Sequence, residues 1–104
     1  GEDLEGKLFR HPDYAPDDEY YMFDSDDLWS DGAYVLLGSD PTRVFVWIGI
    51  EFKECDFNDA ASCQAFAERA TGSLRRSVYV KEGTPVIAVR ENREPDVFWD
   101  YFVL

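Results

Sequence analysis

Two consecutive segments of the chain, AYVLL at 33–37 and RVFVWI at 43–48, are apolar at almost every position. A strand with one face in water alternates between apolar and polar residues, whereas a strand covered on both faces does not. The five residues between them, GSDPT at 38–42, are turn formers, which predicts a hairpin. We therefore expect two central strands in a sheet that other elements cover on both faces.

Residues 58–71 differ from the rest of the chain because they are rich in Ala, Glu, Gln and Arg. The apolar residues here recur three or four positions apart, which predicts an amphipathic helix. They are Ala60, Cys63, Ala67, Ala70 and Leu74. Most of them are small, so the helix axis is expected to lie close to the sheet, and Gly72 is the expected C-terminal stop.

Weaker patterns predict the remaining elements. Residues 77–81 and 86–90 alternate like strands, and short strands are expected near 7–10 and 20–24. Glu94-Pro95-Asp96 opens a short aromatic helix, since proline in the first turn of a helix removes no needed hydrogen bond.

Together these elements predict an α+β fold: one mixed sheet with a helix on each face. The chain has 104 residues, which fits a single domain over 1–104.

Charge narrows the classes of partner. The formal net charge is -12, and an acidic segment at 1–31 holds 11 acidic and 2 basic residues. We therefore do not expect nucleic acid as a partner, because a protein that binds phosphate groups needs positive charge. No apolar run approaches the ~20 residues of a membrane span. The chain has only two cysteines, too few for a disulfide framework, which is typical of proteins in a reducing compartment.

Sequence motifs for catalysis are absent. The single histidine, His11, precedes a proline and has no serine or cysteine nucleophile motif around it. No phosphate-binding glycine loop or zinc-hydrolase motif occurs. Paired acids such as Asp17-Asp18 are typical of solvated charge in an acidic chain. We therefore expect a protein that is not an enzyme.

Three segments together resemble the gelsolin/villin repeat: DGAYVLL at 31–37, RVFVWIG at 43–49 and TPVIAVRENREPDVF at 84–98. GKLFR at 6–10 also resembles the first strand of later repeats in that family, so the resemblance covers about 6–102. Asn92 stands where the family signature has glycine, and asparagine tolerates the left-handed backbone of such a turn.

The resemblance to this family implies a mixed five- or six-stranded sheet between one long and one short helix. It also implies a cytoplasmic protein of the cytoskeleton that interacts with actin or another cytoskeletal protein. The chain is expected to be a fragment of a larger protein that contains neighbouring gelsolin-like repeats.

A calcium site is implied as well. In the family, two of the calcium ligands lie at the start of the strand before the hairpin: a backbone carbonyl and the carboxylate of the next residue. Another ligand is a Glu seven residues after the glycine of VFVWxG. Here Asp31 is at the carbonyl position, Gly32 at the carboxylate position and Asp56 at the Glu position. Asp31 can turn its side chain inward, and Asn58 or Asp59 can substitute for Asp56. Fewer carboxylates imply a weakened calcium site.

The resemblance also implies how actin is contacted. In the actin-binding repeats of the family, the long helix packs into a hydrophobic cleft of the actin monomer. The residues that we expect on the outer face of the helix here are Ala65, Phe66 and Arg69. Phe66 fits a core position equally well.

An alternative function stays open, in which a divergent gelsolin-like domain is a protein–protein interaction module or a regulatory latch without actin binding. The acidic segment 1–31 favours this alternative, because actin is itself acidic and like charges slow association.

Overall fold

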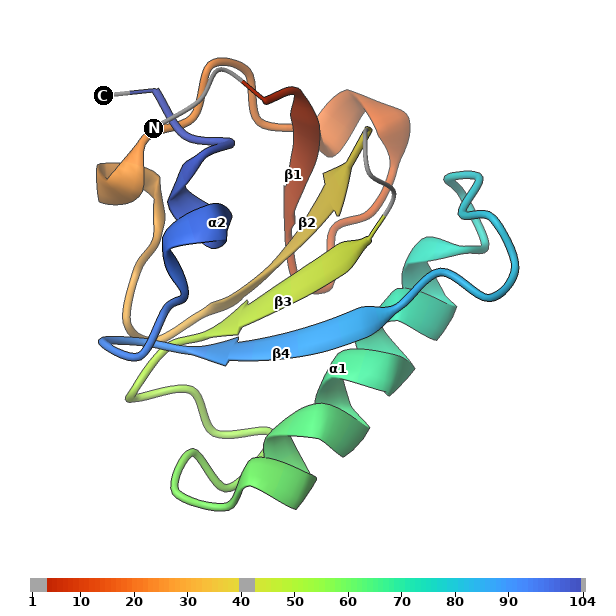
Figure 1. The fold of residues 1–104 in the computed structure, drawn as a ribbon. Helices are drawn as coiled ribbons and strands as arrows, with labels where there is room; N and C mark the ends of the chain where they lie inside the picture. Colours follow the sequence, from red (N-terminus) through yellow and green to blue (C-terminus); the bar gives the residue numbers. More distant parts are fainter. Residues whose placement is uncertain (1–3, 40–42, 104) are drawn as a thin grey trace.

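The computed structural model describes residues 4–39 and 43–103. In chain order its strands and α-helices are β1 (Gly6–Arg10), β2 (Ala33–Gly38), β3 (Val44–Ile48), α1 (Ala60–Leu74), β4 (Val86–Arg90) and α2 (Asp96–Trp99) (Figure 1). Two single-turn 3-10 helices, η1 (Pro16–Asp18) and η2 (Ser25–Asp27), lie in the long connection between β1 and β2. Over this part of the chain, no helix has the length and apolar character that crossing a bilayer requires.

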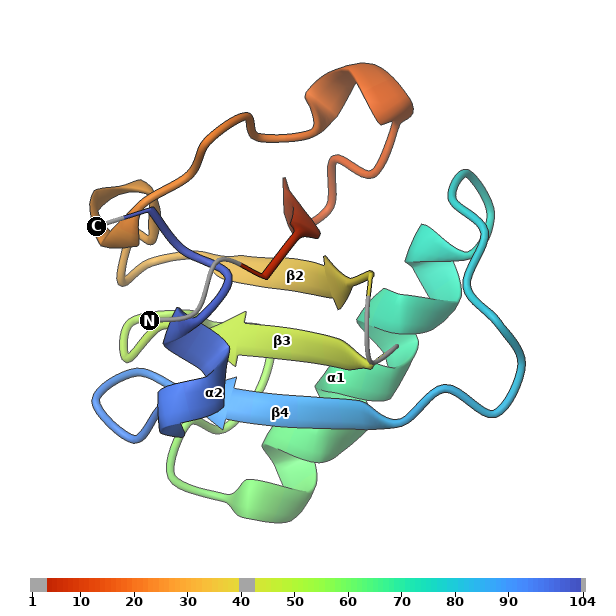
Figure 2. The same cartoon turned by 45° about the horizontal axis from the view of Figure 1, so that its top comes forward.

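The sheet has the order β1-β2-β3-β4. β1 pairs with β2 and β2 with β3 in antiparallel fashion, and β4 then joins β3 in parallel. α1 makes the crossover between the two parallel strands and lies on one face of the sheet, while α2 lies on the other (Figure 2). This arrangement confirms the α+β class and the mixed sheet with a helix on each face.

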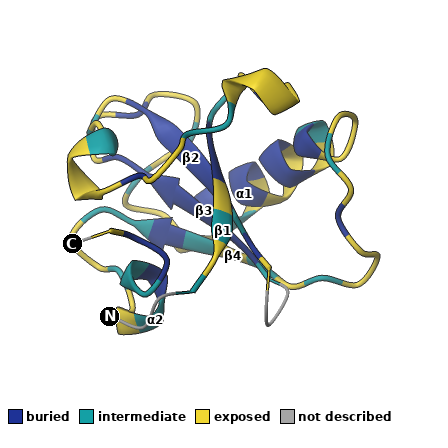
Figure 3. Ribbon diagram, turned by 90° about the horizontal axis from the view of Figure 1, so that it is seen from above, coloured by how far each residue is buried: buried dark blue, intermediate teal, exposed yellow. Residues whose placement is uncertain are grey.

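β3 shows why the central strands lack a polar face. All five of its residues are buried, as Figure 3 shows. Val44, Val46 and Ile48 pack in the core under α1. Phe45 and Trp47 point the other way, into an aromatic core under α2. Because both faces are covered, alternation along the strand separates two cores instead of separating core from solvent.

The expected strand at 20–24 is not present, and within 4–39 and 43–103 the sheet has four strands instead of five or six. Tyr20 makes one isolated bridge with Leu8, through a 2.9 Å hydrogen bond from its N–H to the Leu8 carbonyl. Pairing then stops, because Met22 has a φ of 48° and Asp24 accepts a hydrogen bond from the Asp26 N–H to open η2. A left-handed residue turns the chain away from the ladder.

The expected strand at 77–81 is also absent. The Ser77 and Val78 N–H groups both hydrogen-bond to the carbonyl of Leu74, which continues the end of α1 as a turn. The chain after this turn pairs with no described strand, although Val80 is buried against the core under α1. The alternation of residues 77–81 therefore reflects burial of one side of the segment and not pairing in a sheet.

One helix end differs from the prediction, because Gly72, the expected C-terminal stop, lies inside α1. α1 begins after Asp59, whose side chain accepts a hydrogen bond from the Ala61 N–H, and it continues through Gly72 to Leu74. Asn92 has a φ of 68°, which confirms the left-handed turn expected there. Within the expected hairpin link, residues 40–42 lie outside the described residues.

Candidate functional site

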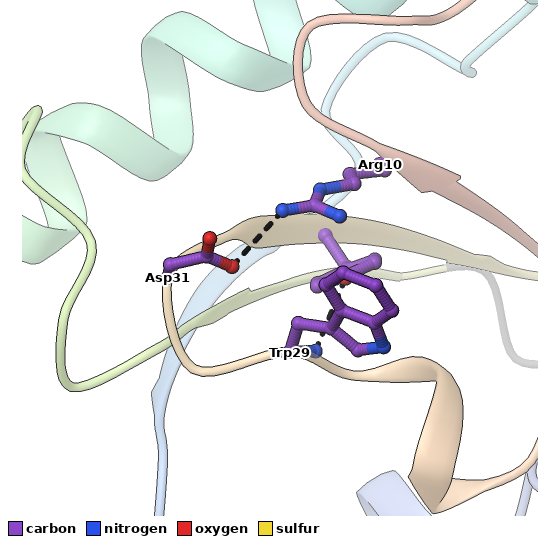
Figure 4. A network of polar contacts seen from close by, with 4 residues as sticks. Arg10, Trp29 and Asp31 are labelled. Carbon is purple, nitrogen blue, oxygen red and sulfur yellow. Dashed lines mark hydrogen bonds and ion pairs between the residues drawn. The ribbon is translucent and has the colours of Figure 1, made fainter.

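The loop that leads into β2 is held by Arg10, the last residue of β1 (Figure 4). Its Nη2 donates a 3.1 Å hydrogen bond to Oδ1 of Asp31. The same guanidinium lies 5.3 Å from the ring centre of Trp29 and 5.6 Å from that of Tyr34. A cation over aromatic faces is attracted by the ring electrons. Arg10 thus joins an ion pair and two aromatic contacts in one place.

Tyr34 completes this network from β2. Its hydroxyl oxygen accepts a 3.1 Å hydrogen bond from the Trp29 N–H, which fixes the loop over the strand. Burial raises the pKa of the Tyr34 hydroxyl above its usual value, more than the Trp29 hydrogen bond and Arg10 lower it. The hydroxyl therefore stays neutral at physiological pH and serves as a structural acceptor.

The segment before α1 is held by the neighbouring residue, His11. Its Nε2 lies 3.3 Å from Oε1 of Glu54, and its ring meets the rings of Phe66 and Phe52 edge-on at 5.0 and 6.1 Å. Successive residues of a strand point to opposite faces. Arg10 therefore contacts the α2 side of the sheet and His11 the α1 side.

Two of the three residues to which the resemblance assigned calcium, Asp31 and Asp56, make other contacts through their carboxylates. The Asp31 carboxylate is paired with Arg10, and position 32 has no carboxylate. The Asp56 carboxylate accepts a 3.0 Å hydrogen bond from the Asn58 N–H. Of the two substitutes, Asp59 caps α1.

Calcium prefers several oxygen ligands, most of them carboxylates and carbonyls. Nowhere within 4–39 and 43–103 do three or more His, Cys, Asp or Glu side chains gather in a way that could hold a metal ion. Calcium binding stays a prediction of the resemblance.

The outer face of α1 differs from the expectation in one residue. Ala65 and Arg69 are exposed, as expected, but Phe66 is only 2% exposed. Phe66 lies in the core under α1, where its ring meets Phe52 at 4.9 Å. The prediction of an outward Phe66 is wrong because Phe52, from the loop after β3, covers that side of the helix. Sequence spacing alone did not reveal this loop contact.

Most of the exposed residues of α1 and of the turn after it are small or positively charged. They are Ala60, Ala61, Ala65, Glu68, Arg69 and Gly72 in α1, with Arg75 and Arg76 in the turn that follows it. Three arginines against one glutamate make this face basic in a chain of net charge -12. Part of this signal is visible in the sequence, since Arg69 and Arg76 lie seven residues apart, which is about two helical turns.

A groove of about 710 Å³ runs beside β1. Tyr21, Met22, Tyr79 and Val103 line it and are all exposed. The Tyr101 hydroxyl, which also lines it, is buried and has no hydrogen-bond partner among the described residues.

Comparison with known proteins gives one kind of match. No family model matches the chain. No curated protein matches it in sequence either. A solved structure does: the crystal structure of the Thorarchaeota 2DGel3/rabbit actin complex contains a chain that matches with a TM-score of 0.57 and 21% identity.

That match covers 99% of this chain and 48% of the neighbour, so this chain spans about half the neighbour's length. At such low identity the likeness shows the fold, which is the α+β gelsolin-like fold expected from the sequence. The neighbour is a gelsolin-like protein that was solved together with actin.

Proposed function

We propose that this chain is an actin-binding, gelsolin-like module that contacts actin through the exposed face of α1. The observation that carries the proposal is the likeness in fold, over 99% of the chain, to a protein solved in complex with actin. The role is that of a binding module of the cytoskeleton in the cytoplasm, without catalysis and with neighbouring repeats in a larger protein.

The surface of α1 supports this assignment. Ala61, Ala65 and Gly72 have small side chains, so a partner surface can approach the helix closely. Arg69 on α1, and Arg75 and Arg76 in the turn that follows it, are exposed and add positive charge. Actin is acidic, and opposite charges speed the encounter of two proteins and fix their orientation. This basic face offsets, at the point of contact, the repulsion that the net charge of -12 produces.

The alternative is a gelsolin-like interaction module or regulatory latch that does not bind actin. Its support is the acidic segment 1–31, with 11 acidic side chains against 2 basic ones. The absence of an outward phenylalanine on α1 also favours it, because Phe66 is buried and adds nothing to an apolar contact.

Binding to actin decides between the two functions. Co-sedimentation with filaments and binding to fluorescently labelled monomers are measured in calcium and in chelator. We expect the wild type to bind in both conditions. Arg69→Glu and Ala65→Glu, which place negative charge on the exposed face, are expected to weaken binding about tenfold or more.

Two matched controls make the same chemical changes elsewhere. Arg93→Glu lies in the turn after β4, and Ala15→Glu lies just before η1; both positions are exposed. Both controls should bind like the wild type. Equal loss in controls and α1 variants would remove α1 as the contact. Failure of the folded wild type to bind in any condition would leave the latch or interaction module.

A further inference from the structure

The end of β1 places two adjacent side chains against two different loops. Arg10 contacts Asp31 in the loop before β2, and His11 contacts Glu54 in the loop before α1. These loops contain the positions where the resemblance places the calcium ligands. In such a site the metal would tie the start of a strand to the start of a helix. Here the last residue of β1 and the residue after it reach the two loops.

The guanidinium of Arg10 fills the space in front of the start of β2. A Cβ atom placed on Gly32 would lie 3.0 Å from Nη2, 3.1 Å from Nε and 3.3 Å from Cζ of Arg10. A carboxylate at position 32 would therefore point at the guanidinium. The Asp31 carboxylate already binds it at 3.1 Å.

Burial and stacking hold this positive charge in place. The Arg10 side chain is 31% exposed, and its guanidinium lies over the rings of Trp29 and Tyr34. A second cation at the same carboxylate would meet a fixed positive charge at short range, which disfavours its binding. The guanidinium therefore disfavours a divalent cation at the Asp31 carboxylate.

We propose that Arg10 is a built-in replacement for a bound cation at the start of β2, and that it makes the folding of this domain independent of calcium. The contact between His11 and Glu54 does the same for the loop before α1, on the other side of the sheet. Gly32 belongs to the same arrangement, because the guanidinium occupies the direction that a carboxylate would take.

Three variants test this proposal by their melting temperatures and by calorimetric titration with calcium chloride. Arg10→Gln removes the charge and keeps most of the stem. Gly32→Asp adds a carboxylate while the guanidinium remains. The double variant Arg10→Gln/Gly32→Asp has the added carboxylate and lacks the built-in cation. Arg93→Gln, at an exposed turn position, is the matched control. Melting is measured in millimolar calcium, in millimolar magnesium and in chelator.

The wild type should melt at the same temperature in all three solutions and release no binding heat. Arg10→Gln should melt about 4 to 8 °C lower in each of them, while Arg93→Gln should not change. The double variant should bind calcium and melt higher in calcium than in chelator, because a ligand of the folded state stabilises it. Gly32→Asp alone should not bind calcium.

Three results would overturn the proposal. One is a wild type whose melting temperature rises in calcium and loses that rise in Asp56→Ala, since this would establish the weakened calcium site. Another is an Arg10→Gln variant as stable as the wild type. The third is a folded double variant that does not bind calcium. Should the double variant fail to fold, the wild-type titration and the comparison of Arg10→Gln with Arg93→Gln still decide the question. None of these measurements involves actin, so failure here leaves the proposed function standing.

Discussion

Replacing Gly49 by alanine tests the packing at the end of β3. A Cβ atom at this position would lie 2.1 Å from the carbonyl oxygen, 2.5 Å from the carbonyl carbon and 2.8 Å from the Cα of Ser30. Ordinary contact between such atoms begins above 3 Å, so Ser30 would have to move by about 1 Å. The obstacle is backbone, which cannot rotate away as a flexible side chain can.

The surrounding hydrogen bonds resist this movement. The Ser30 carbonyl accepts the Glu51 N–H at 2.9 Å, and the Gly49 N–H donates to the Gly32 carbonyl at 3.0 Å. Glu91, just after β4, accepts hydrogen bonds from the Ser30 hydroxyl and the Ile50 N–H, both at 2.8 Å. Shifting Ser30 therefore disturbs the junction of three strand ends.

We expect Gly49→Ala to lower the free energy of unfolding by about 2 to 4 kcal/mol, from overpacking together with one weakened buried hydrogen bond. For a domain of this size, 1 kcal/mol corresponds to about 4 to 8 °C in melting temperature. Gly72→Ala is the matched control, because a Cβ there meets nothing within 4 Å and the residue lies in α1. Alanine favours a helix by about 0.5 to 1 kcal/mol over glycine, so this variant should be more stable than the wild type.

Urea unfolding followed by tryptophan fluorescence, and thermal melting followed by circular dichroism, measure both variants. The two substitutions are chemically identical and should have opposite signs. A Gly49→Ala protein as stable as the wild type would refute the close approach of Ser30, and a destabilised Gly72→Ala would refute the open surroundings of the control.

Three further predictions rest on burial. Phe66→Ala should lower the free energy of unfolding by about 3 to 5 kcal/mol in urea titrations, because it leaves a cavity in the core under α1; an exposed position would give less than 1 kcal/mol. Burial, with a smaller effect of the neighbouring Cys63, raises the pKa of the Cys55 thiol to about 12. Cys55 should therefore react with a thiol reagent at pH 8 far more slowly in the folded protein than in urea, and equal rates would contradict this. Burial also raises the pKa of the Tyr14 hydroxyl, more than Glu54 and Asp13 do. The folded state thus favours the neutral hydroxyl. The stabilisation that Tyr14 gives the folded state is therefore complete below the ordinary pKa of 10.0 and is lost as the pH rises above it. Urea midpoints between pH 8 and 11.5 should fall at the alkaline end, and fall less in Tyr14→Phe.

The central part of the fold follows from local patterns in the sequence. The uninterrupted apolar residues of β2 and β3 predicted strands with both faces covered, and the small-residue spacing in α1 predicted the helix that covers one of them. The resemblance implied a turn at Asn92, and asparagine tolerates the left-handed backbone that this turn has. Each of these properties belongs to a few neighbouring residues, so the sequence alone is sufficient to predict it.

Pairing and contacts between distant segments were decided only by the tertiary structure. Residues 20–24 and 77–81 have strand-like composition, but no described strand edge extends a ladder along them. Phe66 became a core residue because Phe52 covers it. Arg10 reached Asp31, 21 residues away, because β1 lies beside β2 in one register. Sequence periodicity records which sides of a segment avoid water, whereas the identity of the neighbour on each side depends on how the whole chain closes around its two cores.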